Sequence, residues 1–292
     1  MSRSGKAMLV VVVIAMLLSG AWLLERRPVS SLDQSQSGPG RDSPPLVGRD
    51  SFGSSSTQRL SKPKPVAGSR KAFLLTDPGA ILSGDALEVI AQLEPRAMNG
   101  DAEAAYAIFL KLSDCKSKLS GEHAGALPQY SNAGAAQGLL GELERAEQEC
   151  GGLSDAAYQR SGDWLEKAAA GGSLAAQLYY AADPAQIFGS QADMLRQPDR
   201  VKDYKSKAMS YLSVASSNGS IDATLGLANA YWAGVLVDAD PVRSYAYYYA
   251  VSSVDANLVP RRRMNDLAGG LSSQQLGDAI SQGRKIYEQC CK

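Results

Sequence analysis

A short phrase that begins with glycine occurs three times along this chain of 292 residues, and it limits the folds that the chain can adopt. The phrase reads Gly-Asp-Ala-Glu-Ala from Gly100, Gly-Ser-Leu-Ala-Ala from Gly172 and Gly-Ser-Ile-Asp-Ala from Gly219. An aromatic residue lies eight positions before the second and third glycines, at Trp164 and Tyr211. Each phrase opens a stretch in which apolar residues recur at helical intervals.

The intervals between these markers predict a repeated helix-turn-helix unit. Trp164 and Tyr211 are 47 positions apart, and the next equivalent aromatic residue, Tyr247, follows 36 positions later. A unit of 36 residues with an insertion of eleven fits both intervals. One helical pair cannot bury its own apolar face, whereas stacked pairs bury it against each other. We therefore predict an all-α fold of stacked helix-turn-helix units.

Residue size explains why these positions recur. Small residues let neighbouring helices approach closely, aromatic residues fill the space between successive pairs, and glycine permits tight reversals. The positions that we assign to the repeat itself are Gly100, Trp164, Gly172, Tyr211, Gly219, Ala223, Gly234 and Tyr247.

The residues that carry this period resemble Sel1-like repeats, which are relatives of the tetratricopeptide repeat, in an exported bacterial protein. The clearest copy begins at Gly219, and its matching positions are Ala223, Leu227, Tyr231, Gly234, Val237, Asp240, Arg243, Tyr247 and Val251. The resemblance covers about residues 85–255. It implies an α-solenoid of about three units, a concave scaffold that binds another protein, and no catalytic residues.

Several positions depart from the pattern of the family. Leu236 stands where the family has a second turn glycine, and Ala228 stands at its helix glycine. Asp183 and Pro184 interrupt the second copy where its first helix should finish, and a proline there shortens a helix. We therefore expect one truncated unit and irregular helices at both ends of the domain.

The N-terminal residues 1–27 have the composition of an export segment. Residues 7–24 are apolar apart from Ser19 and Gly20, and as a helix they would span ~27 Å of a hydrocarbon core about 30 Å thick. The segment therefore fits a single membrane anchor with a periplasmic C-terminal domain. The alternative is a signal peptide cleaved after Ala21, which would leave a periplasmic or secreted protein.

Residues 28–70 separate this segment from the predicted domain at 71–292. In this stretch 22 of 43 residues are serine, proline or glycine, so it cannot build a core, and we predict a disordered linker. The net charge of zero divides into +3 for residues 1–27, +3 for 28–70 and −6 for the remainder. An acidic domain is a poor nucleic-acid binder, and the sequence predicts no nucleic-acid partner.

The export segment makes disulfides more favourable for the four cysteines than they would be in an intracellular protein. Cys115 and Cys150 lie at the ends of predicted helices that flank a long loop, and we predict a bridge between them; the alternative is two buried thiols. Cys290 and Cys291 are adjacent, closer than ordinary disulfide geometry prefers. They could pair elsewhere, cross-link two chains or form an exposed thiol pair.

The sequence contains none of the common catalytic motifs, and it predicts a non-enzyme without a cofactor, a metal site or a small-molecule substrate. The single histidine, His123, has no nucleophile at a motif position around it. The alternative function is a cell-wall hydrolase or its accessory binding domain, since carboxylates alone can cleave glycosidic bonds. The candidate acids for that reaction would be Glu88, Glu103, Glu142 and Glu166.

A cluster of aromatic residues is the candidate docking site for the protein partner. Large aromatic side chains favour such sites. Successive residues of a helix are turned by about 100°, so Tyr245, Tyr248 and Tyr249 cannot all face the core with Tyr247. At least one of them should face outward or into a groove; the alternative is that they seal the domain against its C-terminal helices. The candidate residues are Tyr231, Trp232, Tyr245, Tyr248 and Tyr249.

Overall fold

The structure is a computed structural model that describes residues 63–76, 79–120 and 133–292. The chain divides into residues 1–52 and residues 53–292, and all described residues belong to the second unit. The predicted export segment 1–27, residues 28–62 of the predicted linker and His123 lie outside the described residues. Within the described ranges no helix is both long enough and apolar enough to cross a membrane.

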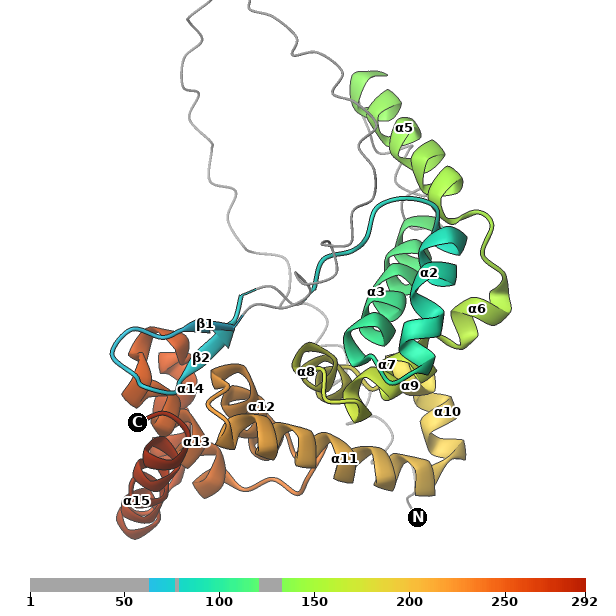
Figure 1. The fold of residues 1–292 in the computed structure, drawn as a ribbon. Coiled ribbons are helices and arrows are strands. Elements are labelled where there is room, and N and C mark those ends of the chain that lie inside the picture. Colours follow the sequence, from blue (N-terminus) through green and yellow to red (C-terminus); the bar gives the residue numbers. More distant parts are fainter. Residues whose placement is uncertain (1–62, 77–78, 121–132) are drawn as a thin grey trace, which may run out of the picture. The chain divides into compact units, whose positions relative to one another are not determined.

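The described part of the chain is mostly α-helical (Figure 1). Three pairs of helices pack against each other in chain order. They are α3 (Ala102–Leu119) with α7 (Ser161–Ala170), α8 (Leu174–Ala182) with α11 (Pro198–Ser217), and α12 (Ile221–Ala233) with α13 (Pro241–Val254). The second helix of each of the first two pairs also contacts the first helix of the next pair. This is the stacked helix-turn-helix arrangement that the repeat predicts.

Additional helices precede, interrupt and follow these pairs. Helix α2 (Ala86–Met98) packs on α3 at the start, and α14 (Arg261–Gly270) and α15 (Ser273–Cys290) pack on α13 at the end. The remaining helical elements are α5 (Ala133–Cys150), α6 (Asp155–Gln159), α9 (Ala185–Phe188), α10 (Gln191–Arg196) and the 3-10 turn η3 (Ala256–Leu258).

The repeated phrase forms the same turn in all three copies. Gly100, Gly172 and Gly219 have φ angles of 93°, 96° and 102°, which glycine adopts without the strain that a Cβ atom would cause. In the first copy the amide of Gly100 donates to the carbonyl of Ala97 at 3.2 Å, and the amide of Asp101 donates to that of Arg96 at 3.0 Å. The other two copies repeat both bonds, so each is a Schellman turn that ends one helix.

The residue after each glycine starts the next helix. The side chains of Asp101, Ser173 and Ser220 accept hydrogen bonds from the amides of the alanines three positions later, and therefore act as N-caps. Those alanines, Ala104, Ala176 and Ala223, are completely or almost completely buried. One residue thus closes a helix through its amide and opens the next through its side chain, which makes the connection very short.

The tyrosines at the repeat positions contact the other helix of their own pair, whereas we expected them to fill the space between successive pairs. Trp164 is buried, and Tyr211 meets Tyr180 edge to face with ring centroids 5.6 Å apart. Tyr247 is half-buried and stacks on Tyr231, with centroids 5.8 Å apart. These rings fill the space that the small residues leave between stacked helices.

The predicted departures from the repeat are visible in the second pair. Helix α8 ends at Ala182 and is capped by Asp183, because Pro184 cannot continue it. The short helices α9 and α10 then fill the inserted residues before α11 begins. In the third pair, Gly234 adopts the left-handed conformation and ends α12.

The described part of the chain begins before residue 71, and it is not entirely helical. Strands β1 (Pro63–Pro65) and β2 (Phe73–Leu75) form an antiparallel hairpin in which Pro63 is opposite Leu75. The amide of Phe73 donates to the carbonyl of Gly219 at 2.9 Å. The last residues of the predicted linker are therefore fixed against the turn that opens α12, which composition alone does not reveal.

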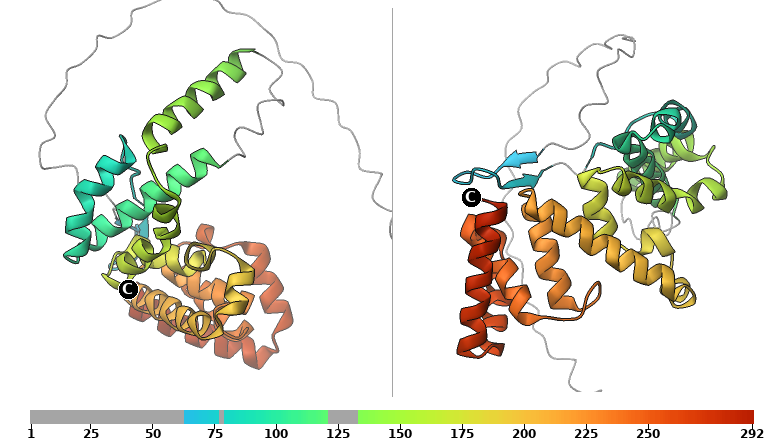
Figure 2. Two further views of the ribbon diagram at one scale, coloured as in Figure 1. Left: turned by 90° about the vertical axis from the view of Figure 1, so that its right-hand side faces the viewer. Right: turned by 60° about the horizontal axis from the view of Figure 1, so that its bottom comes forward.

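Helix α15 runs along α13 and covers it (Figures 1 and 2). Gly283 makes this close approach possible, because a Cβ atom there would lie 2.7 Å from the carbonyl oxygen of Ala246. At the end of α15, Cys290 and Cys291 are joined as a disulfide and are buried. The sequence left three alternatives open, namely pairing elsewhere, a cross-link between chains and an exposed thiol pair, and the structure shows none of them at these two cysteines. The hydroxyl of Ser69 in the hairpin donates to the carbonyl of Cys291.

Cys115 and Cys150 form the other disulfide, with Cα atoms 5.4 Å apart. Cys115 lies on α3 and Cys150 is the last residue of α5, so the bond joins α5 to the first helix pair. Both residues are buried with Ala86 in a small cluster of their own. The bond closes the loop whose residues 121–132 lie outside the described ranges.

The Gly219 turn provides a test of this packing. In Gly219→Ala the new Cβ atom would lie 2.4 Å from the carbonyl oxygen of Lys71, whereas the space at Gly172 is open. Both alanine variants pay the cost of a positive φ, about 1–2 kcal/mol. We expect Gly219→Ala to lose clearly more stability in urea denaturation than Gly172→Ala. Equal losses in the two variants would contradict the contact between the hairpin and α12.

The disulfides are testable by peptide mapping of the purified full-length chain without reductant. We expect one peptide pair linked through Cys115 and Cys150, and one C-terminal peptide in which Cys290 and Cys291 have lost two hydrogen atoms. Quantitative alkylation of Cys115 and Cys150 in the folded, unreduced chain would rule the first bond out. A cross-linked dimer through the C-terminal peptide would rule the second out.

Candidate functional site

An apolar groove of about 620 Å³ lies between the second and third helix pairs. Its walls come from the first helices of these pairs, α8 and α12, and from α11 between them. Met194 of α10 and the turn after α12 complete it. The residues that line it are Leu178, Ala181, Ala182, Pro184, Met194, Tyr204, Lys205, Leu212, Asp222, Leu225, Gly226, Asn229, Ala230, Ala233, Val235 and Leu236.

Small side chains keep this groove open. Ala181 and Ala182 end α8, and Ala230 and Ala233 lie one helical turn apart near the end of α12. Larger residues at these positions would fill the space between the helices. Ala182 and Ala233 are exposed, and Val235 at the rim is 56% exposed. The groove therefore exposes apolar side chains to solvent.

Tightly packed residues form the floor of the groove. A Cβ atom at Gly226 would lie 2.8 Å from a methyl carbon of Leu212, so glycine lets α12 approach α11 closely. The hydroxyl of Tyr204 donates to the carbonyl of Tyr180 at 2.6 Å. Burial raises the pKa of Tyr204 well above its usual range, so this hydroxyl stays protonated and donating. The floor is a fixed surface on which a ligand would rest.

Two charged side chains line the groove, and they differ in their surroundings. The carboxylate of Asp222 accepts a hydrogen bond from the amide of Leu75 at 2.7 Å, which connects the groove to the β-hairpin. Lys205 is half-buried and has no ion pair with any described residue. The carboxylate of Asp222 is thus already hydrogen-bonded within the chain, whereas Lys205 has no counter-charge among the described residues.

Asn229 is an exposed polar residue of the groove with a defined orientation. Its Oδ1 accepts hydrogen bonds from the hydroxyl of Tyr248 at 2.5 Å and from Nη1 of Arg263 at 3.0 Å. These two donors identify which end of the amide is the oxygen. Its Nδ2 makes no hydrogen bond to the described residues, so two N–H donors remain for a ligand.

The tyrosines of α13 in the predicted docking cluster are buried or half-buried. Tyr248 is 1% exposed, so its ring is core and its assignment to a partner-binding surface is wrong. Tyr245 and Tyr249 are half-buried, and Tyr249 packs where α15 passes at Gly283. Helix α15 therefore seals this part of α13. Tyr204 is the only tyrosine among the described residues that line the groove.

Tyr231 and Trp232 lie on α12 with arginines against their rings. The guanidinium of Arg263 is 3.9 Å from the ring centroid of Trp232, which is 49% exposed. The guanidinium of Arg243 is 5.4 Å from the ring centroid of Tyr231 and donates to its hydroxyl at 3.1 Å. Both arginines therefore have a cation–π partner within the chain. Trp232 alone among the five candidates offers a large exposed ring.

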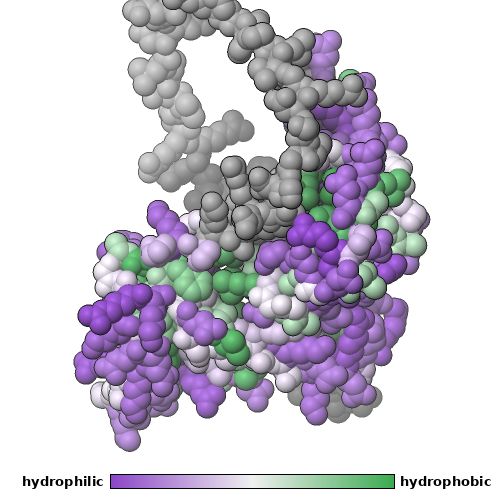
Figure 3. Space-filling model, viewed as in Figure 1, coloured by the Kyte–Doolittle hydropathy of each residue, from purple (hydrophilic) through white to green (hydrophobic). Residues whose placement is uncertain are grey.

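The space-filling view shows how polarity is distributed on one face of the molecule (Figure 3). The surface over α15 is mostly hydrophilic, and apolar residues gather beside it toward the hairpin and α12. A covered α13 and a hydrophilic α15 agree with the sealing role of the C-terminal helices. The sequence directed attention to tyrosines, whereas the groove depends on alanines on α8 and α12. The recurrence of alanines at the ends of α8 and α12 was the sequence signal for this groove.

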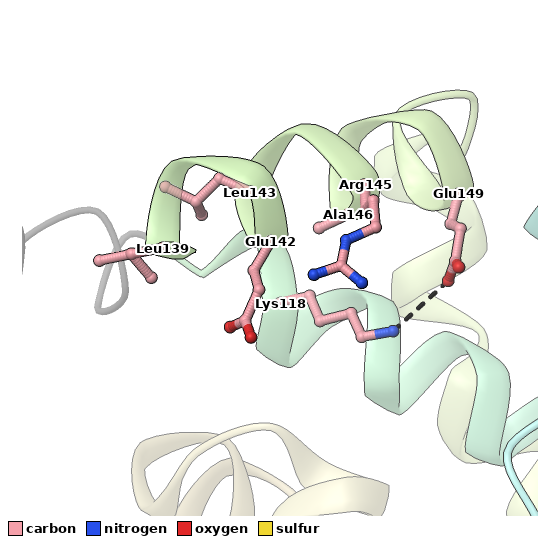
Figure 4. Close-up of a pocket in the computed structure, with 7 residues that line it drawn as sticks. All are labelled: Lys118, Leu139, Glu142, Leu143, Arg145, Ala146 and Glu149. Atoms are coloured by element: carbon pink, nitrogen blue, oxygen red, sulfur yellow. Dashed lines mark hydrogen bonds and ion pairs between the residues drawn. The ribbon is translucent and has the colours of Figure 1, made fainter. Parts of the chain in front are cut away.

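A smaller hollow of about 350 Å³ lies between α3 and α5 and is lined by charged residues (Figure 4). Lys118 of α3 forms ion pairs with Asp114 at 2.8 Å and with Glu149 of α5 at 3.4 Å. Glu149 also pairs at 3.5 Å with Lys111, whose side chain is completely buried. Burial alone would raise the pKa of Glu149, but Lys118 and Lys111 lower it below its usual range. These contacts fasten α5 to the first pair.

The described residues include no group of three His, Cys, Asp or Glu side chains placed to hold a metal ion. Glu166, one of the candidate acids of the alternative function, accepts a hydrogen bond from Tyr180 at 3.4 Å and pairs with Arg200 at 3.9 Å. Glu142 lines the smaller hollow.

No protein-family model matches the chain, and no curated protein matches its sequence. Among solved structures, it is similar to a protective antigen present in uropathogenic Escherichia coli strains, which displays an SLR fold. The two share 21% identity, and the match has a TM-score of 0.38. It covers 70% of this chain and 41% of that one, so the chain spans less than half of the neighbour.

Glu149 gives a prediction about pH. Because its pKa is lower in the folded chain, its charge stabilises the fold above about pH 4.5, and that contribution is lost as the pH falls through the folded-state pKa. We expect Glu149→Gln to be less stable than wild type at pH 7, and the difference to shrink by pH 3. Urea denaturation at both pH values measures it. A difference that is independent of pH would contradict the assigned ion pairs.

Proposed function

We propose that this chain is a non-catalytic scaffold that binds another protein, and that the groove between the second and third helix pairs is the binding site. The observation that carries the proposal is the groove itself: apolar, open to solvent and bounded by rigidly packed helices. Grooves with apolar walls and a few placed polar groups are typical of binding sites. Stacked helical pairs are widely used as extended binding surfaces.

The finer assignment to Sel1-like repeats is part of this proposal. It is supported by the three identical turns at Gly100, Gly172 and Gly219 and by the alternation of first and second helices that follows from them. The lengths of the pairs differ because of the insertions at α5–α6 and α9–α10. Those insertions leave the turn geometry unchanged.

We also propose that the domain works outside the cytoplasm, in the periplasm or an equivalent space. Residues 7–24 would tether it to the membrane, or cleavage after Ala21 would release it. The two disulfides support this location, because such bonds persist in oxidising compartments and are rare in the cytosol. The export segment would then place the groove beyond the membrane.

Site-specific crosslinking in living cells tests the binding role. A photo-reactive amino acid at Ala182 or Ala233, both exposed in the groove, should yield covalent adducts with the same partner protein. The matched control is Ala170, which is also exposed and also the last residue of its helix, but lies on α7 outside the groove.

A blocking variant makes the test decisive. Ala233→Arg should abolish adducts formed from position 182, whereas Ala170→Arg should leave them unchanged. Arginine at the last residue of a helix is favourable to the helix dipole, so neither variant should unfold the chain. Equal adducts from positions 170 and 182, or adducts that survive Ala233→Arg, would contradict the groove as the binding site.

A further inference from the structure

We propose that the groove binds an extended polypeptide segment in which apolar side chains flank a carboxylate, with the carboxylate paired to Lys205 and the segment's backbone held by Asn229. This inference rests on the proposed function and specifies the chemistry of the partner. It follows from three features of the groove as the described residues form it: apolar walls, a cation without an ion pair and an oriented amide.

Lys205 has no counter-charge among the described residues. It is half-buried in a groove lined mostly by apolar residues, and none of the described carboxylates pairs with it. A partly desolvated cation gains most from an ionised acceptor, since charge-assisted hydrogen bonds are about twice as strong as neutral ones. The ligand group that complements it is therefore a carboxylate.

The other charge in the groove sets where that carboxylate lies. Asp222 stands beside the Gly219 turn, where α11 meets α12, and its oxygen holds the hairpin through Leu75. Lys205 lies about four turns of α11 before Gly219, which is roughly 20 Å along the helix. A bound carboxylate is thus repelled at the Asp222 end and attracted at the Lys205 end, so the ligand has one preferred register.

Asn229 lies on α12 and lines the groove, and its Nδ2 makes no hydrogen bond to the described residues. Because Tyr248 and Arg263 both donate to its Oδ1, the amide cannot flip without losing two hydrogen bonds. Its Nδ2 is therefore prepared for a ligand carbonyl oxygen, and it recognises the backbone rather than a particular side chain. An extended strand advances about 3.3 Å per residue, so roughly six residues would span the groove from Asp222 to Lys205.

Selection from a random peptide library tests the charge requirement. Heptapeptides displayed on phage would be selected against the full-length chain immobilised in detergent. The protein variants are wild type, Lys205→Glu, Lys205→Gln and Lys207→Glu. Lys207 is the matched control because it is exposed on the same helix outside the groove. We expect wild type and Lys207→Glu to enrich Asp or Glu among apolar residues, and Lys205→Glu to enrich Lys or Arg instead.

Affinities of a selected peptide and its Glu-to-Gln counterpart separate the two polar contacts. Lys205→Gln should weaken the acidic peptide about tenfold and leave the neutral one unchanged. Asn229→Ala should weaken both by the same factor, roughly fivefold. Melting curves of each variant identify any loss that is due to unfolding.

The outcomes distinguish this inference from the function on which it rests. Apolar peptides enriched without an acidic residue, or an acidic preference that survives Lys205→Glu, would overturn the inference and leave a binding groove. Failure of wild type to enrich any peptide beyond the groove-blocked Ala233→Arg would overturn the proposed function as well.

Discussion

The structure depends on a turn in which one glycine and its neighbour join two helices. The glycine takes a positive φ, its amide and the next amide satisfy carbonyls of the helix that ends, and the following Asp or Ser caps the helix that begins. Because the connection is so short, it fixes the relative direction of the two helices and places a buried alanine at the crossing. Repetition at Gly100, Gly172 and Gly219 makes three such crossings from one local rule.

The groove follows from this rule together with the insertions. Pro184 ends α8 early, and the short helices α9 and α10 contain the inserted residues. The last residues of α8, which line the groove opposite α12, are therefore alanines. The hairpin 63–75 contacts α12, and α14 and α15 pack on α13. The groove between α8 and α12 stays open.

Much of the fold was predictable because it is local. The glycine turns and the end of α8 depend on residues close in sequence, and the Cys115–Cys150 bond spans only one loop and one helix. The hairpin was missed because the group that Phe73 bonds to, the carbonyl of Gly219, is far away in the sequence. Tyr248 was misassigned because the rotation of α13 is set by α15, which lies beyond the repeat. Lys205 and Asn229 escaped notice because a site shared by three helices leaves no motif.

Hydrogen exchange resolved to single amides tests the shared turn most directly. The amides of Asp101, Ser173 and Ser220 donate to carbonyls five residues earlier at 3.0, 3.1 and 3.0 Å. If the three turns are as described, these amides exchange as slowly as those inside the flanking helices, although they lie between helices. If any of the three exchanges at the rate of an unstructured chain, that turn does not exist, and the repeat account fails at that copy.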